Sequence, residues 1–555
     1  MRTATSNGFW LGGAQSVSAT VVGYLARIDG YGNANCTASG DCATKSLTAC
    51  SDGNVCTGDA CAAGTCSHAN FGSGLPCEDG SACTLDLCDA AAGCNPSNVA
   101  DGLACEDGSA CTLKDSCKAG ACAAGVKSTF SHALGFDYYA GLTGVAVNAT
   151  GYAYAGRAHG TDNLWMVVTD LGGTILNGDA NGDAGNVVDL GGFDELHDVV
   201  TSGSGWTFAG NTGADQTHDD GLLYAVAADG LTMLWKKTYG GTGQDELHAI
   251  ATRPGGYVAC GGTSSSLLGG DENFWLLTTD ASGNNATSHN FYDQASYYQS
   301  CAGVIVAANG DIVMAGRADN GGWVVRTDAS GAKLWDKRIA GDFNATTSLG
   351  TGLSKVVEVA GTLYVVGSYV AGPAATSKVW LVALDANGNV LWQKTYGSTA
   401  DDFGSGIAAT GDGLILAGAT DGFGAPAREG YVVRTDLNGN LLWQKAIPRP
   451  SDSTNATGTC SLAAVATATD GFVIAGTDDQ KGWGDGWIVK LDSWGNVTCA
   501  DSGSCGGEAE TFCDDANPCT ADVCAAATNG LCSHTQLADG SVCGTGKTCT
   551  TGVCK

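Results

Sequence analysis

The chain has 555 residues, a net charge of −31 and only 15% charged residues, whereas glycine contributes 85 residues. The low charged fraction excludes coiled coils, and the strongly negative charge opposes binding to nucleic acid or to an anionic membrane surface. Eight prolines and 44% hydrophobic residues exclude collagen and general disorder, so we expect a turn-rich, all-β globular protein.

Residues 1–35 read as a partial copy of a repeat that recurs later in the chain. NGFWLGG matches the later DGFVIAG, and GYLARIDGYGNANC matches GWIVKLDSWGNVTC. We therefore expect residues 1–35 to be the remnant of an upstream repeat, with a genuinely short gene as the alternative. Met1 to Ala19 lacks the pattern of a secretion signal, and no run of 18 apolar residues predicts membrane insertion.

Cysteines divide the chain into three zones. Fourteen of the 26 lie in residues 36–125, nine lie in residues 499–555, and only three lie between. In the flanking zones the spacing repeats as modules of four cysteines, with related text such as CSDGNVCTGDAC and CEDGSACTLDLC. The modules comprise Cys50, Cys56, Cys61 and Cys66; Cys77, Cys83, Cys88 and Cys94; Cys105, Cys111, Cys117 and Cys122; and Cys513, Cys519, Cys524 and Cys532.

Disulfides explain these modules better than zinc does. No C-x-x-C pair occurs, and the histidines are not spaced as zinc ligands. A module of about 25 residues cannot bury a sufficient core, so disulfides must hold it, which requires an oxidising compartment. Four cysteines allow three pairings, and the sequence does not choose among them. We predict disulfide-rich modules at 36–125 and at 499–555, the latter possibly truncated after Cys554.

The modules resemble the short cysteine repeat first named from slime-mould extracellular proteins, whose core reads C-x-D-G-N-x-C-T-x-D-x-C. The resemblance covers roughly a quarter of the chain and implies an extracellular spacer or matrix module, without chemistry of its own.

Between these zones one pattern of about fifty residues is repeated seven times. Each copy contains a glycine-opened apolar strand, such as GYAYAG or GFVIAG, and then a strand that ends in Asp, such as LWMVVTD or GWIVKLD. Repeats of this length with strand-like text are typical of propeller blades. We predict a seven-bladed β-propeller over residues 126–498, and residues 1–35 are then a partial blade.

An aromatic residue precedes the strand-ending Asp by five positions in every copy. This odd offset places the ring and the carboxylate on opposite faces of a strand, so we expect the ring to wedge between blades while the Asp begins a tight turn. The aromatics are Trp165, Tyr224, Trp275, Trp323, Trp380, Tyr431 and Trp487, and the aspartates are Asp170, Asp229, Asp280, Asp328, Asp385, Asp436 and Asp492.

Two repeated features allow a functional alternative. A second tryptophan follows the turn at Trp235, Trp335, Trp392 and Trp443, where packing is favoured over a sugar-stacking platform because the position recurs. The text DELH occurs at Asp194–His197 and at Asp245–His248. Two histidines on consecutive blades can hold a metal ion, but a repeated motif more often serves the fold.

The ends of the repeat region predict how the ring closes. The last copy lacks a fourth strand, whereas Val126 to Gly135 precede the first complete copy. We expect this stretch to pair with the strand ending at Asp492 and thereby to seal the ring. We also expect Cys260 and Cys301 to pair between neighbouring blades.

The blade text LDANGNVLW resembles that of quinoprotein-type propellers, in which an Asp-x-x-x-Gly turn precedes a docking tryptophan. It resembles more closely that of long bacterial surface proteins made of seven-bladed repeats. This resemblance covers roughly two thirds of the chain and implies a fold rather than an activity.

Departures from the repeat are the candidate ligand sites. GDANGDAGNVVD places Asp179, Asn181, Asp183 and Asp189 like the oxygen ligands of a Ca²⁺ loop, although the glycine is one position late, and an ordinary long hairpin is the alternative. Other loops between the second and third strands are expected to gather on one face as a binding surface. Their candidate residues are His159, Asp162, His218, Asp219, Asp220, Asp271 and Glu272.

Two classes of function follow. We expect a non-catalytic extracellular or cell-surface adhesion or structural module, in which the propeller binds a protein, a glycan or further copies of itself and the cysteine modules are stiff spacers. The sequence requires no cofactor and shows no G-x-S-x-G, H-E-x-x-H or phosphate-loop motif. The alternative is a secreted propeller enzyme that acts on polysaccharide or protein, for which a unique cluster of acids converging in one place would be the sign.

Overall fold

A computed structural model of the chain divides into two compact units, Met1–Gly125 and Val126–Lys555. It describes residues 4–5, 8–17, 20–28, 56–62, 65–70, 81, 83–89, 93–105, 112–113, 115–123, 125–127, 129–135, 140–158, 163–178, 184–203, 205–214, 218–265, 272–292, 298–319, 321–339, 352–370, 376–424, 427–449, 458–468, 471–480, 483–493, 495–497, 520–524, 532–536, 542–544, 547–550 and 553–554.

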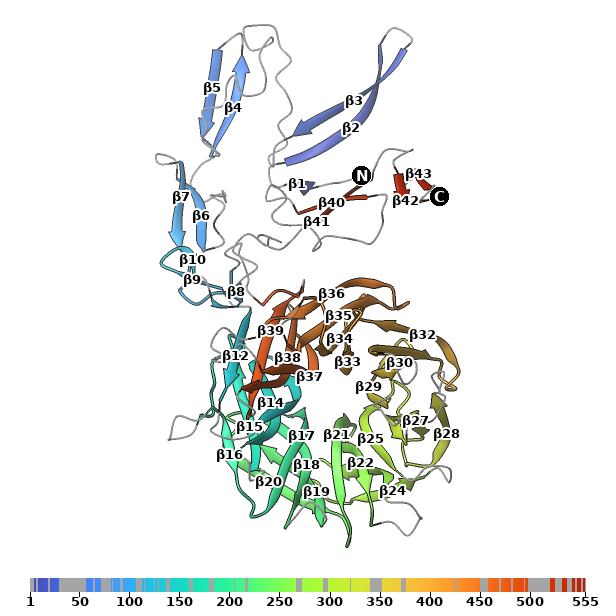
Figure 1. Cartoon of the computed structure of the whole chain (residues 1–555). Helices are drawn as coiled ribbons and strands as arrows, with labels where there is room; N and C mark the ends of the chain where they lie inside the picture. The colour runs from blue at the N-terminus through green and yellow to red at the C-terminus, as the bar shows by residue number, and fades with distance from the viewer. Residues whose placement is uncertain are drawn as a thin grey trace. The chain divides into compact units, whose positions relative to one another are not determined.

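The second unit contains a ring of four-stranded antiparallel sheets, which we call blades 1 to 7 in chain order (Figure 1). Blades 1 to 3 consist of β13 (Gly141–Val147), β14 (Gly151–Ala158), β15 (Asn163–Asp170) and β16 (Asn186–Val188); β17 (Phe193–Ser202), β18 (Gly205–Gly213), β19 (Asp219–Val226) and β20 (Met233–Tyr239); and β21 (Asp245–Arg253), β22 (Gly256–Thr263), β23 (Asn273–Asp280) and β24 (Thr287–Phe291). Blades 4 to 6 consist of β25 (Gln299–Val306), β26 (Ile312–Ala318), β27 (Gly321–Thr327) and β28 (Lys333–Ile339); β29 (Gly352–Val359), β30 (Thr362–Val370), β31 (Ser377–Leu384) and β32 (Val390–Tyr396); and β33 (Asp402–Ala409), β34 (Gly413–Thr420), β35 (Glu429–Asp436) and β36 (Leu441–Ile447). Blade 7 combines β37 (Thr459–Ala468), β38 (Gly471–Gln480) and β39 (Trp483–Asp492) with β12 (Phe130–Leu134).

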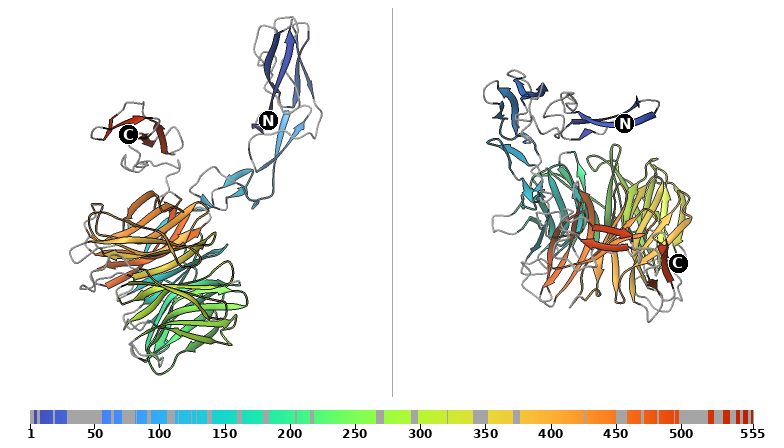
Figure 2. Two further views of the ribbon diagram at one scale, coloured as in Figure 1. Left: turned by 90° about the vertical axis from the view of Figure 1, so that its right-hand side faces the viewer. Right: turned by 90° about the horizontal axis from the view of Figure 1, so that it is seen from above.

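The first strand of each blade lies nearest the centre of the ring and the fourth lies at its periphery (Figure 1). The ribbon colours pass from teal through green and yellow to orange around the ring, so the blades follow chain order (Figure 1). Figure 2 shows the same blades in two further views. The predicted fold class, an all-β propeller with disulfides, is confirmed, and every described element is a strand.

The hydrophobic core lies between blades rather than within them. Every blade-to-blade cluster joins side chains of two neighbouring sheets, and the cluster around Leu142 and Trp165 joins blade 1 to Ala475 and Ile488 of blade 7. The predicted wedge role of the strand-3 aromatics is confirmed, since all seven are at most 5% exposed and pack on the preceding blade.

The predicted start of the turn is wrong in blade 2. In the other blades the aromatic lies opposite the glycine that ends the apolar part of strand 2, as Trp275 lies opposite Gly261. In blade 2, Leu222 takes that place opposite Gly210, and Tyr224 is displaced by two residues. The reason is the turn, which begins at Ala227 rather than at Asp229. Because a shift of two residues keeps the same face, Tyr224 is still buried between blades.

The turn after strand 3 has the predicted tight geometry. In the turn of blade 3, the Asp280 carboxylate accepts hydrogen bonds from the backbone N–H groups of Ser282 and Asn284, and Gly283 has a φ of 72°. This positive φ favours glycine. The hydrogen bonds lower the pKa of the Asp280 carboxyl, because they favour the ionised form.

These turn glycines also receive a side chain from the preceding blade. A Cβ atom at Gly283 would lie 2.7 Å from the ring of Trp235, so the ring of blade 2 rests directly on the backbone of blade 3. The same contact recurs around the ring, and the docking side chains in chain order are Asn177 on Gly230, Trp235 on Gly283, His289 on Gly331, Trp335 on Gly388, Trp392 on Gly439, Trp443 on Gly495 and Phe130 on Gly173. The second tryptophans therefore pack rather than form a sugar platform.

The predicted seam is confirmed. Strand β12 pairs antiparallel with β39, with Phe130 opposite Lys490 and Leu134 opposite Gly486. The indole N–H of Trp487 donates a hydrogen bond to Ser131 Oγ at 3.0 Å. A segment that precedes blade 1 in the sequence thus completes blade 7, and its Phe130 docks on the turn of blade 1.

The first unit consists of short sheets. Its N-terminal sheet contains β1 (Ala4–Thr5), β2 (Gly8–Val17) and β3 (Thr20–Ile28), and Tyr24 lies opposite Gly13 as Trp487 lies opposite Gly476 in blade 7. The cysteine zone has hairpins in which the third and fourth cysteines of a module face each other, as Cys61 faces Cys66 and Cys88 faces Cys94. Its strands are β4 (Thr57–Ala62), β5 (Thr65–Asn70), β6 (Thr84–Asp89), β7 (Gly93–Asn98), β8 (Thr112–Leu113), β9 (Ser116–Lys118) and β10 (Ala121–Ala123).

The disulfides show that the cysteine modules are not self-contained, contrary to what the sequence suggests. Cys56 of the first module bonds Cys88 of the second, and Cys83 of the second bonds Cys117 of the third, whereas Cys105 bonds Cys122 within the third. Cys117 and Cys122 face each other in one hairpin but bond different partners. The bonds from Cys56 to Cys88 and from Cys83 to Cys117 covalently interlock consecutive modules. The sulfurs of Cys83, Cys105 and Cys117 lie within 4.8 Å of one another, but all three are in disulfides, which argues against zinc there.

Four further cysteines have described side chains, of which Cys94 lies in the first unit and Cys260, Cys301 and Cys460 lie in the second. Cys260 bonds Cys301 between blades 3 and 4, as predicted, and Cys460 is a buried thiol. Cys94 is also in a disulfide. The second unit begins with β11 (Val126–Lys127). Its described C-terminal strands are β40 (Thr520–Cys524), β41 (Cys532–Gln536), β42 (Val542–Gly544), β43 (Lys547–Thr550) and β44 (Val553–Cys554). The predicted disulfide side chains outside the described set are Cys50, Cys61, Cys66, Cys77, Cys111, Cys513, Cys519, Cys524 and Cys532.

Replacing Phe130 with alanine should destabilise the propeller by about 3 kcal/mol or more, because the ring is 7% exposed and joins blade 7 to blade 1. The measurement is urea unfolding followed by tryptophan fluorescence. The control is Leu334→Ala on β28, where the side chain is 54% exposed and the change should stay within about 0.5 kcal/mol. Equal midpoints for the two variants would refute the seam.

Peptide mapping after non-reducing alkylation should recover Cys56 cross-linked to Cys88 and Cys83 cross-linked to Cys117. Recovery of Cys56 bonded to another cysteine of its own module would show that the modules are separate.

Candidate functional site

The inner strands share one irregularity that shapes the centre of the ring. Each carries a β-bulge directly after the residue that packs into the core, so one extra residue is inserted at the same level in every blade. The bulged residues in blade order are Thr143, His197, His248, Ala302, Ser354, Ser405 and Ala463. Only blades 2 and 3 place a ring there, and the other five residues are small.

In each DELH motif the Asp and the Leu serve the fold, whereas the Glu and the His remain partly exposed. Asp194 accepts hydrogen bonds from Leu190 N and Thr212 Oγ1, and Asp245 has equivalent bonds with Gly241 N and Thr263. Leu196 and Leu247 are fully buried in the core. The glutamate and histidine of each motif remain partly exposed, at 14% for Glu195 and 19% for His197. The prediction that the motif serves the fold is thus right for its first and third residues.

The contacts of His248 favour its cationic form. Its Nε2 lies 2.8 Å from Glu246 Oε2 and its Nδ1 lies 3.0 Å from the carbonyl oxygen of Cys301. Both partners are acceptors, so both ring nitrogens donate. Burial alone would lower the pKa of His248, but the hydrogen bond and charge of Glu246 raise it above its usual value. Burial opposes ionisation of Glu246 as well, yet His248 lowers the pKa of Glu246 to about 2.

The surroundings of His197 favour its neutral form, and its ring lies 5.0 Å from that of His248. Burial lowers its pKa below the usual value, and the nearby His248 lowers it further. The amide of Asn211 donates to Asp219 Oδ2 at 3.2 Å, which turns Asn211 Oδ1 toward His197 Nε2 at 2.9 Å. Nε2 therefore carries the proton, and Nδ1 keeps its lone pair.

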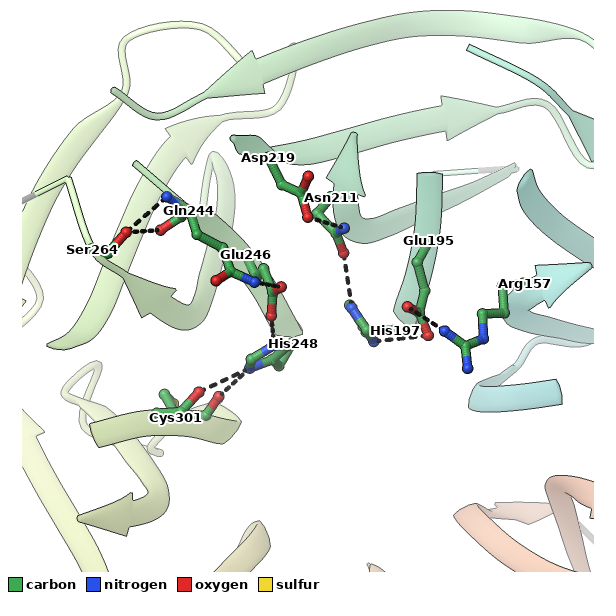
Figure 3. A network of polar contacts seen from close by, with 11 residues as sticks. Arg157, Glu195, His197, Asn211, Asp219, Gln244, Glu246, His248, Ser264 and Cys301 are labelled. Carbon is green, nitrogen blue, oxygen red and sulfur yellow. Dashed lines mark hydrogen bonds and ion pairs between the residues drawn. The ribbon is translucent and has the colours of Figure 1, made fainter. Parts of the chain in front are cut away.

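Figure 3 shows the two rings side by side, with Glu195 and Arg157 beyond His197 and with Cys301 beyond His248. Glu195 Oε2 accepts a hydrogen bond from Arg157 Nη1 at 3.3 Å, and its other oxygen lies 3.9 Å from His197 Nδ1. Gln244 Nε2 donates to Glu246 Oε1 at 2.6 Å. Three adjacent blades thus contribute alternating charges to one network.

Glu272 extends this network from the loop before β23. Burial raises the pKa of its carboxyl, whereas hydrogen bonds with Tyr298 and Ser300 and the charge of His248 oppose the rise. Ser300 Oγ lies 3.2 Å from His248 Nδ1. Arg317 stacks on the Tyr298 ring at 4.3 Å from its centroid. We call Arg157, Glu195, His197, Asn211, Glu246, His248, Glu272 and Ser300 the central cluster.

An ion pair crosses the centre of the ring beside this cluster. Lys355 Nζ of blade 5 lies 2.9 Å from Asp198 Oδ2 of blade 2, and these residues directly follow the bulges of their strands. Blades 2 and 5 are not neighbours, so the pair joins opposite sides of the ring. No local sequence pattern indicates this contact, because the two residues are separated by 157 positions.

The structure brings some of the predicted loop residues to this cluster and not others. Glu272 belongs to the central cluster, and Asp219 contacts the cluster by accepting a hydrogen bond from Asn211. Burial and the neighbouring Asp245 raise the pKa of the Asp220 carboxyl. His218 is exposed. His159, Asp162 and Asp271 lie outside the described residues, as do the calcium candidates Asp179, Asn181 and Asp183. The described Asp189 carboxylate accepts a hydrogen bond from Gly191 N, and the calcium loop stays a prediction.

A metal ion between the two histidines does not fit this geometry. Both nitrogens of His248 donate hydrogen bonds, so neither offers a lone pair. The sequence missed Arg157, Asn211 and Ser300 entirely. The bulges did leave a signal, because Leu196 and Val199 are both buried although their odd spacing breaks the two-residue period of a strand.

No protein-family model and no curated protein matches the chain. Among solved structures, a Trypanosoma rangeli sialidase in complex with 2,3-difluorosialic acid has 10% identity and a TM-score of 0.35, and the match covers 56% of each chain. Sqt1 from Chaetomium thermophilum has 13% identity and a TM-score of 0.37, covering 63% of this chain and 82% of Sqt1. The Dos1 propeller has 10% identity and a TM-score of 0.35, covering 66% and 95%. These chains are β-propeller proteins, and the similarity concerns the fold alone.

The two histidines should titrate on opposite sides of pH 6.5. In an NMR titration, we expect the His248 midpoint above this value and the His197 midpoint below it. The raised pKa of His248 contributes stability below about pH 6.5 that is lost as the pH rises through its folded pKa. The depressed pKa of Glu246 contributes stability above about pH 4.5 that is lost as the pH falls toward 2. The pair therefore stabilises most between these limits.

The variant Glu246→Gln should lower the His248 midpoint, because it removes the carboxylate but keeps the size of the side chain. The control is Glu358→Gln in β29 of blade 5, which should leave both histidine midpoints unchanged. Coincident midpoints for His197 and His248 in the wild type would contradict the assignment of two protonation states.

Proposed function

We propose that the chain is a non-catalytic extracellular or cell-surface binding module, with the propeller as the platform and the cysteine modules as stiff spacers. The observation that carries this proposal is the departure from the repeat at the bulge positions. The seven-fold pattern of packing residues is used by the fold, whereas the polar central cluster occurs once among the described residues, on blades 1 to 4. A single ligand needs one binding site per ring, and this cluster is present once in the described part of the chain.

The charges of the cluster support binding rather than turnover. Glu195 is paired with Arg157, Glu246 with His248, and Asp198 with Lys355. Such mutual pairing fixes side chains in one arrangement and suits recognition, because a preorganised surface loses little entropy on binding.

The spacer role and the extracellular location rest on the disulfides. Bonds from Cys56 to Cys88 and from Cys83 to Cys117 prevent consecutive modules from separating. Disulfides of this density persist in oxidising compartments. The described residues contain no helix long and apolar enough to cross a membrane. The resemblance of the blade text to long bacterial surface proteins agrees with this location.

An enzyme is the second candidate, and one observation favours it. Burial raises the pKa of Glu272, while His248 lowers that of Glu246, and both carboxylates act on the same histidine. Two carboxyl groups with separated pKa values are the usual arrangement for acid and base catalysis. The substrate would then be a polysaccharide or a protein.

Binding without turnover is the expected result on arrays of glycans and of extracellular proteins. The full chain should be retained saturably, and mass spectrometry should recover the bound ligand unchanged after prolonged incubation. Shortened ligand that is lost with Glu272→Gln would instead establish the enzyme. Absence of retention on both arrays would refute the binding platform.

A further inference from the structure

We propose that the central cluster binds a neutral, polyhydroxylated ligand, a glycan, through His197 Nδ1 and Glu195 Oε1. This inference rests on the proposed function, since it names the ligand class of the same platform. It follows from the two acceptor atoms, from the charges beside them and from the small residues at the bulges of the other blades.

The two acceptors lie side by side with unused lone pairs. His197 donates through Nε2 to Asn211, so its Nδ1 is an acceptor, and no described residue hydrogen-bonds to it. Glu195 uses Oε2 for Arg157 and presents Oε1 toward the histidine. The distance of 3.9 Å between Nδ1 and Oε1 is too long for a direct hydrogen bond. Two neighbouring hydroxyl groups of a sugar can each donate to one of these atoms.

The charges on both sides exclude ionic ligands. Arg157 and the cationic His248 flank the acceptor pair, which opposes an ammonium group. Glu195 and Glu246 oppose a sulfate or a carboxylate. Because each sign of charge meets a like charge within the same network, a neutral donor of hydrogen bonds is the ligand that fits.

A metal ion does not fit the same pair of atoms. Protein ligands bind first-row metal ions at about 2.0–2.2 Å. In a tetrahedral site with such bonds two ligand atoms lie about 3.3–3.6 Å apart, whereas Nδ1 and Oε1 are 3.9 Å apart.

The bulges of blades 4 to 7 carry only small residues. These residues are Ala302, Ser354, Ser405 and Ala463, none of which has a bulky side chain. One residue further along the strands, the Asp198–Lys355 pair crosses the centre and limits the depth of the site.

An aromatic ring stands next to the cluster. Tyr298 is 40% exposed, hydrogen-bonds Glu272 and has Arg317 on one face of its ring. Its accessible surface offers an apolar contact for the C–H face of a sugar, beside carboxylate and hydroxyl groups that can bind its hydroxyls.

The test uses the full chain on an array of neutral, sialylated and sulfated oligosaccharides, followed by titration with the neutral oligosaccharide that binds. The variant His197→Phe keeps a ring beside His248 but removes the acceptor, and we expect affinity to fall about tenfold or more. The matched control is His132→Phe on the exposed face of β12, which should bind like the wild type. Thermal unfolding of each variant verifies the fold.

A second measurement needs no variant. In ¹⁵N NMR of the wild type, the unprotonated Nδ1 of His197 should shift when the neutral oligosaccharide is added, because it accepts a new hydrogen bond. Unchanged affinity in His197→Phe or an unmoved Nδ1 signal would overturn the site, and preference for sulfated or sialylated glycans would overturn the ligand class.

The same experiments separate this inference from the proposed function. Retention on proteins but on no glycan would overturn the glycan and leave the platform standing. Cleavage of a bound neutral glycan, with loss of binding in His197→Phe, would support the site and overturn the non-catalytic function.

Discussion

The structure depends on the contact between an outer-strand side chain and the turn glycine of the next blade. Each contact needs a residue without Cβ on one side and a side chain that can cover bare backbone on the other. Because the turn Asp fixes its own loop through hydrogen bonds, the ring of Trp235 or Trp392 lands on a rigid surface. Six of the seven contacts come from outer-strand side chains, whereas Val168 and Asn177 of blade 1 meet Gly230. One outer-strand side chain joins blade 7 to blade 1 and completes the series. Phe130 is that side chain.

Periodicity made the fold predictable from the sequence. A pattern repeated seven times reports strand identity, turn chemistry and the missing fourth strand of the last copy, and hence the seam between β12 and β39. The same reliance on the pattern caused the error in blade 2. Asp229 occupies the aspartate position of the repeat, but the turn of blade 2 starts at Ala227. Only the backbone hydrogen bonds reveal this difference. A local text cannot distinguish two positions that share one face of a strand.

Long-range partners were the unpredictable part of the structure. Spacing identifies a cysteine module, but it cannot show that Cys56 pairs with a cysteine 32 residues away in the next module. The site behaves in the same way. Asp219 and Glu272 were recognisable as departures from the repeat, whereas the role of Asn211 or Arg157 follows only from the ring that brings blades 1 and 2 together. His197 and His248 were discounted because DELH occurs twice, although duplication of a motif on adjacent blades also duplicates its neighbourhood.

Adjacent copies of one motif acquire different chemistry through their following blade. His197 and His248 occupy equivalent bulges and each has a glutamate two residues before it. His248 meets the Cys301 carbonyl and Ser300 on blade 4, which completes a set of acceptors for a cation. His197 instead meets Asn211 within its own blade, and its ring faces the charge of His248. Since two cations at this distance repel, protonation of one ring keeps the other neutral. The pKa values of two equivalent histidines thereby diverge, and a repeated sequence acquires the asymmetry that binding of a ligand in a single orientation would require.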